Sequence, residues 1–198
     1  MPTVEQEIKQ QFARLFVAQD ASLFKRMADY YYERAAFLRN ADIEISQRLK
    51  LLARNCQKRL FIGIGTELLL KAIYLSRGFS INKIEKGQPG APAFPFTFRQ
   101  VAGIKQANDQ TYMLNELIQK LDQILTPASL HNVTRGLQIA KVFRNKEGHV
   151  VLPTHNFDSS NYRDIESALV TLYSLCFRET LVVRFSVASG EKAAWRIR

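Results

Sequence analysis

The chain has 198 residues, of which 46% are apolar and 23% charged, and its formal net charge is +10. This length and composition suit one globular domain with a buried core, and they exclude a chain that is disordered throughout and a collagen-like fibre. So large an excess of Lys and Arg indicates an anionic partner, namely nucleic acid, nucleotide or a membrane surface. A solvated basic surface without a partner is the alternative.

The cysteines and the apolar runs indicate in which cellular compartment we expect the protein. Cys56 and Cys176 lie far apart, each in an apolar helical stretch. This spacing argues against a disulfide scaffold and a cysteine-based zinc site, and it favours buried thiols in a reducing compartment. The first residues do not resemble a signal peptide, and no apolar run approaches the ~20 residues of a membrane span. We therefore expect a soluble cytoplasmic protein with no membrane partner.

Helical spacing of apolar residues begins near the start of the chain. An N-terminal helical extension is predicted over residues 1–40, and Asp20 or Ser22 is the candidate cap for its second helix. A longer helix follows and ends at Gly78. Its internal Gly63 and Gly65 are costly in a helix, so they indicate close approach of another helix or a kink.

Residues 79–110 break the helical pattern, because glycine and proline recur throughout them. We expect a long loop or insertion there. Phe94, Phe96 and Phe98 alternate along an extended run, and Arg99 follows. Such aromatic residues can stack on bases, but the expected role is to pin the loop to the core.

Helical patterns return after the insertion and continue toward the end of the chain. Helices are predicted over 113–125 and over 128–146, followed by a last long helix that carries Leu181 on its apolar side and ends at Gly190. A short basic tail over 191–198 closes the chain. The predicted fold is all-α, a bundle of about five to seven helices forming a single domain over 1–198.

One stretch of the helix before the last concentrates chemically useful side chains. At 100° per residue, one face carries Lys141, Arg144, Asn145, Gly148 and His149. The arginine can fork two phosphate oxygens, and the histidine titrates near neutrality and can move a proton. The asparagine lies four residues before the histidine, where it can orient the ring. This face suits a phosphodiester.

The same stretch resembles a known family. Residues 144–149, Arg-Asn-Lys-Glu-Gly-His, resemble the R-N-x-x-x-H signature of the HEPN superfamily of helical-bundle proteins, many of which are metal-independent ribonucleases. Residues 67–71, Glu-Leu-Leu-Leu-Lys, resemble the E-x-x-x-K motif of part of that superfamily. The order of the helices that carry the two motifs also matches.

The resemblance implies an endoribonuclease that needs no metal or other cofactor. Its site would form across a homodimer, with RNA as substrate. The catalytic residues implied are Arg144, Asn145 and His149. The supporting residues implied are Glu67, Lys71, Lys141 and Gly148, with Lys71 contacting phosphate or Glu67 holding Arg144.

Further cations extend the predicted RNA-binding surface. Lys50, Arg54 and Lys58 recur every four residues on the long helix and form a candidate phosphate-tracking stripe, to which Arg99 of the insertion is added. A solvated helix face is the equal alternative for the stripe.

Two other classes of function stay open. One is a non-catalytic module that binds nucleotide, RNA or a protein partner, and the other is a DNA-binding regulator, which lacks a compact helix-turn-helix signal here. By analogy, a HEPN ribonuclease would be a toxin or defence effector, held in check by an inhibitor or switched on by an activator protein. The HEPN toxins controlled by tyrosine modification carry tyrosine where this chain has Val151, which argues against that subgroup.

Overall fold

The computed structural model describes most of the chain. The residues described are 3, 4, 6, 19–38, 48–126, 130–131, 133–147, 157–186 and 192–198. Within these ranges, side chains are described for all residues except 48–54, 108–109 and 146–147. Predictions outside the described residues include the helix stop at Gly190 and the placement of Gly148, His149 and Val151.

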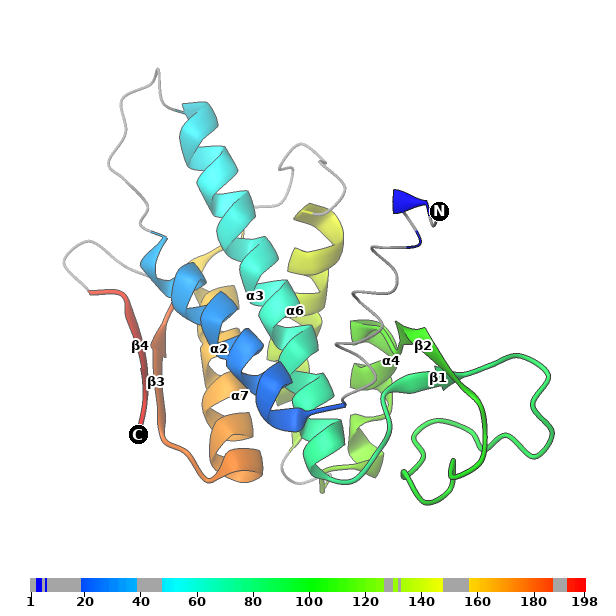
Figure 1. Ribbon diagram of the computed structural model, residues 1–198. Helices are drawn as coiled ribbons and strands as arrows, with labels where there is room; N and C mark the ends of the chain where they lie inside the picture. Colours follow the sequence, from blue (N-terminus) through cyan, green and yellow to red (C-terminus); the bar gives the residue numbers. More distant parts are fainter. Residues whose placement is uncertain are drawn as a thin grey trace.

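Four longer helices build the described part of the molecule, so the prediction of a mainly helical fold is confirmed. They are α2 (Ala21–Phe37), α3 (Arg48–Ser76), α6 (Val133–Glu147) and α7 (Ser159–Phe177). The central helix α3 packs against α2 and α6, and α6 packs in turn against α7 (Figure 1). A short helix α4 (Leu114–Gln119) and the 3₁₀ turn η2 (Leu121–Gln123) lie in the stretch predicted as one helix over 113–125.

Local signals account for where these helices begin and end. The carboxylate of Asp20 accepts the Ser22 amide at 2.8 Å and caps α2, as predicted. Gly78, at φ +82°, closes α3 in the left-handed region, also as predicted. At the N-terminus, Thr3 and Gln6 exchange the two hydrogen bonds of a capping box. No helix in the described residues is both long and apolar enough to cross a membrane.

The end of the chain corrects the prediction of an all-α fold. Helix α7 ends at Phe177, because Arg178 adopts a left-handed conformation with φ 58°. Strands β3 (Leu181–Arg184) and β4 (Ala194–Ile197) then form an antiparallel hairpin, in place of the helix predicted to continue to Gly190 and the tail predicted over 191–198. Residues 181–185 alternate between buried and exposed, which is the period of a strand.

The insertion also contains a sheet where a long loop was predicted. Strands β1 (Asn82–Ile84) and β2 (Gln106–Thr111) pair antiparallel at its base. The ring of Phe94 stacks on Tyr74 of α3 with 5.3 Å between ring centroids, and it also contacts the ring of Tyr112. These contacts pin the insertion to the helices, and Phe96 is fully buried, so the expected structural role holds for Phe94 and Phe96. Phe98 departs from it, because its side chain is exposed.

Both glycines inside α3 mark close approaches, as predicted. A Cβ added at Gly63 would lie 2.6 Å from Cβ of Arg144 and 2.8 Å from its Cα, so α6 crosses α3 at this point. A Cβ added at Gly65 would lie 3.0 Å from the ring of Tyr32 on α2. Thus α3 has a neighbouring helix on each side, and each meets it at a glycine.

We expect Gly63→Ala to lower the free energy of unfolding by about 2 kcal/mol, because the new methyl group meets the Arg144 backbone and forces the two helices apart. Gly65→Ala is the matched control. It meets only a side-chain ring and gains helix propensity, so its stability stays within about 1 kcal/mol of wild type. Urea denaturation measures both variants. A Gly63→Ala variant at least as stable as Gly65→Ala would contradict the tight crossing.

Candidate functional site

One face of α3 turns toward α6 and carries a polar stripe. Arg59, Gly63, Glu67 and Lys71 follow one another at four-residue spacing, so they lie along the same side of the helix. Gly63 removes the side chain at the crossing point, and the backbone of Arg144 occupies that space. Because Gly63 has no side chain, α6, which carries Arg144, can lie close to α3, which carries Glu67 and Lys71.

The carboxylate of Glu67 lies between two cations. Its Oε2 is 2.8 Å from Nε of Arg144, and its Oε1 accepts a hydrogen bond of 2.8 Å from Nζ of Lys71. The exposed fraction of the side chain is 11% for Glu67, 5% for Lys71 and 29% for Arg144. Burial makes charge pairing necessary for Glu67 and Lys71, while the guanidinium of Arg144 stays partly open to solvent.

Two further predicted residues of α6 have different surroundings. The side chain of Asn145 is exposed, directly after Arg144. Nζ of Lys141 donates to Oδ1 of Asn115 at 3.1 Å, so it ties α6 to α4 instead of facing the Glu67 carboxylate. His149 and Gly148 lie outside the described residues. The structure thus brings together Arg144, Glu67 and Lys71 from the predicted set.

The predicted RNA-binding cations are described only in part, and Lys58 departs from the prediction. The side chains of Lys50 and Arg54 lie outside the described ones, and Arg99 is exposed in the insertion. Lys58 departs from the predicted stripe, because it is only 3% exposed and its ammonium group donates to the carbonyl oxygen of Phe185. The chain after β3 covers this side of α3, which the helical pattern alone did not indicate.

Arg59 is a buried cation that the sequence analysis did not select for the site. It is 7% exposed, its guanidinium lies 5.3 Å from the ring centroid of Phe157, and its Nη2 is 3.6 Å from Sγ of Cys56. Arg59 lies four residues before Gly63 and eight before Glu67, and this spacing could have placed it on the face toward α6.

The described residues contain no group of three or more His, Cys, Asp or Glu side chains that could hold a metal ion. Comparisons of the chain with protein-family models, with curated proteins and with solved structures found no match. The functional argument therefore depends on the chemistry of these residues and on the resemblance of the two motifs.

We expect Glu67→Gln to lower the free energy of unfolding by about 3 kcal/mol, because it leaves the buried ammonium of Lys71 without its carboxylate. Adding Lys71→Met to this variant removes the buried ammonium and regains part of the loss. The control is Glu85→Gln, which breaks an exposed pair with Lys105 and changes stability by less than about 0.5 kcal/mol. Equal effects of Glu67→Gln and Glu85→Gln in urea denaturation would refute a buried ion-pair network.

Lys58 gives a prediction for the pH dependence of stability. Burial lowers the pKa of its ammonium to about 8, with nearby Glu166 opposing the shift. Because the amine has a pKa of about 10.4 in an unfolded chain, the unfolded state binds more protons between these two values, and stability rises with pH there. Relative to Lys58→Met, we expect wild type to gain about 1–2 kcal/mol between about pH 7.5 and pH 9.5 in urea denaturation. A difference that does not change with pH would contradict the low pKa.

Proposed function

We propose that this chain is a HEPN-type, metal-independent endoribonuclease. The observation that carries the proposal is the ion pair between Arg144 and Glu67, with Lys71 on the second carboxylate oxygen. It joins the R-N-x-x-x-H segment to the E-x-x-x-K segment, although the two lie far apart in the sequence. Residues that serve one reaction must meet in space, and these motif residues do.

The geometry gives Arg144 and Glu67 distinct roles in this proposal. Oε2 of Glu67 lies 2.8 Å from Nε of the guanidinium as an ion pair without hydrogen-bond geometry, so in this proposal Glu67 is a positioning residue that keeps the guanidinium beside it through charge attraction. The two terminal Nη nitrogens lie at the far end of the guanidinium, where they can fork two oxygens of a phosphodiester. Because the side chain is 29% exposed, substrate can reach it.

The reaction follows from these groups together with His149. The imidazole accepts the proton of a ribose 2′-OH, and the 2′ oxygen attacks the adjacent phosphorus. The bond from phosphorus to the 5′ oxygen breaks and leaves a 2′,3′-cyclic phosphate. Arg144 stabilises the charge that develops on the phosphate, and Asn145 orients the ring. DNA lacks the 2′-OH and is not cleaved in this way.

Two aspects of the proposal come from the resemblance alone. The first is that two copies of the chain join their motif helices, so that the second His149 protonates the leaving 5′ oxygen. The second is the biological role, a cytoplasmic toxin or defence effector whose activity is governed by an inhibitor or activator protein.

A non-catalytic binding module is the second candidate, and one observation favours it. The carboxylate of Glu67 already balances charge at Arg144, as in a purely structural ion pair. In that case the Glu67 network only holds α3 and α6 together, and a nucleotide or RNA would bind without being cleaved. The two candidates differ in whether the chain turns over RNA.

The cleavage test uses purified protein and mixed cellular RNA in EDTA. We expect wild type to release products with 2′,3′-cyclic phosphate ends. Removal of the acid–base group in His149→Ala, or of the charge-stabilising group in Arg144→Ala, lowers the rate by about 10²-fold or more. The matched control is His131→Ala, which removes an exposed histidine at the start of the same helical region and leaves the rate unchanged.

Circular dichroism of each variant establishes that the fold is retained. Cleavage by a folded His149→Ala protein at the wild-type rate would refute the mechanism. RNA or nucleotide binding without cleavage by wild type would establish the binding module instead.

A further inference from the structure

The β3–β4 hairpin is anchored to the helices through one row of side chains. The ring centroid of Trp195 lies 5.3 Å from that of Tyr32 on α2 and 5.8 Å from that of Tyr173 on α7. On the facing strand, Leu181 and Val183 are buried. Successive side chains of a strand point to opposite faces, so a slip of one residue would expose Trp195. This anchoring fixes which side chains point outward.

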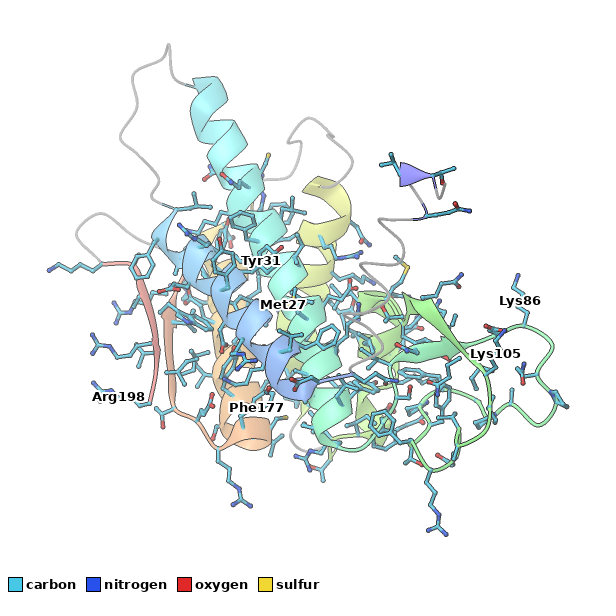
Figure 2. The ribbon with its side chains drawn as sticks, in the orientation of Figure 1. Met27, Tyr31, Lys86, Lys105, Phe177 and Arg198 are labelled. Carbon is cyan, nitrogen blue, oxygen red and sulfur yellow. The ribbon has the colours of Figure 1, made fainter. Side chains whose placement is uncertain are left out.

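The outward row is strongly basic. It contains Arg184 on β3, Arg196 on β4 and Arg198 directly after β4, all exposed, and we call these residues the hairpin arginine face. Figure 2 labels Arg198, which lies at the outer side of the molecule beyond the helices. Each arginine has an uncharged neighbour on the paired strand. These neighbours are Ala194 opposite Arg184, Val182 opposite Arg196 and Thr180 opposite Arg198.

Folding does not require this concentration of charge. None of the ion pairs among the described residues includes Arg196 or Arg198, and the sequences of β3 and β4 contain no acidic residue. Arg184 lies within electrostatic reach of Glu166, so the argument rests on the other two. Arg196 and Arg198 are two residues apart and therefore lie on the same side of the chain, and the residues opposite them, Val182 and Thr180, carry no negative charge. An anionic ligand would supply the opposite charge that this face lacks.

We propose that the hairpin arginine face binds the phosphate backbone of RNA. The proposal rests on the proposed function, because it takes the RNA of the cleavage reaction as the ligand, and it adds a contact outside the Glu67 network. Guanidinium groups bind phosphate oxygens bidentately, and such contacts position a strand without reading its sequence. The face lacks the large apolar side chains that an interfacial membrane contact requires, since its one exposed apolar strand residue is Val182.

The test compares two double variants that each remove two positive charges. Arg196→Gln with Arg198→Gln alters the hairpin arginine face. Lys86→Gln with Lys105→Gln is the matched control, because these lysines lie on the opposite side of the molecule in Figure 2. The probe is a labelled single-stranded RNA with 2′-O-methyl riboses, which the proposed reaction cannot cleave, and fluorescence anisotropy measures its binding over a range of salt concentrations.

The arginine variant is expected to bind the RNA about 5- to 10-fold more weakly at low salt, and the slope of log K against log salt falls by about 1.4, which is 0.7 for each lost phosphate contact. The lysine variant stays within twofold of wild type. Trp195 is the single tryptophan of the chain, so unchanged tryptophan fluorescence shows that the hairpin is still docked.

Equal losses in the two variants would overturn the proposal in favour of a general charge effect. Unchanged binding by a docked arginine variant, or no RNA binding by wild type, would overturn it as well. Loss of binding to anionic phospholipid vesicles with unchanged RNA binding would assign the face to a membrane instead. The proposed function is judged separately by cleavage: if wild type cleaves RNA and the arginine variant binds normally, the reaction stands and the hairpin contact fails.

Discussion

The crossing of α3 and α6 is the constraint on which the candidate site depends. Gly63 lets the backbone of Arg144 approach α3 to a distance that no larger residue allows. One turn further along α3, Glu67 is then within reach of the Arg144 guanidinium, at 2.8 Å from its Nε. The backbone contact sets the distance between the two helices, and at that distance the Glu67 carboxylate attracts the Arg144 guanidinium.

Much of the helical core could be predicted from the sequence, because its signals are local. The Asp20 cap depends on a short side chain that accepts a nearby backbone amide, the stop at Gly78 on a positive φ, and the two glycines inside α3 on a close approach that glycine permits. The motif spacing also placed Glu67 and Arg144 on helices. Their contact was one of two roles that the sequence left open for the acidic motif, and only the packing of α3 on α6 shows it.

The features that the sequence analysis missed depend on contacts between distant residues. Leu181 continues the helical spacing of α7, so periodicity favoured a longer helix, whereas the backbone turns at Arg178 and the next residues alternate as a strand. Lys58 shares a helical face with Lys50 and Arg54, so the helical pattern predicted an exposed side chain. It is buried because its amine reaches the carbonyl of Phe185, a partner that lies 127 positions away. Helical periodicity carries no information about such partners.

The long-range contacts of α2 and α3 have a consequence for synthesis on the ribosome. Asp29 on α2 accepts a hydrogen bond from Tyr173, which lies 144 positions later. The amine of Lys58 on α3 donates to the carbonyl oxygen of Phe185, which lies 127 positions later. At translation speeds of about 5–20 residues per second, the nascent chain spends roughly 6–30 s without these partners. During that time Trp195 does not yet cover the ring of Tyr32 on α2. These contacts form only after the β3–β4 hairpin has been synthesised. A chain that ended before β3 would leave Tyr32 without the ring of Trp195 and Lys58 without the carbonyl oxygen of Phe185.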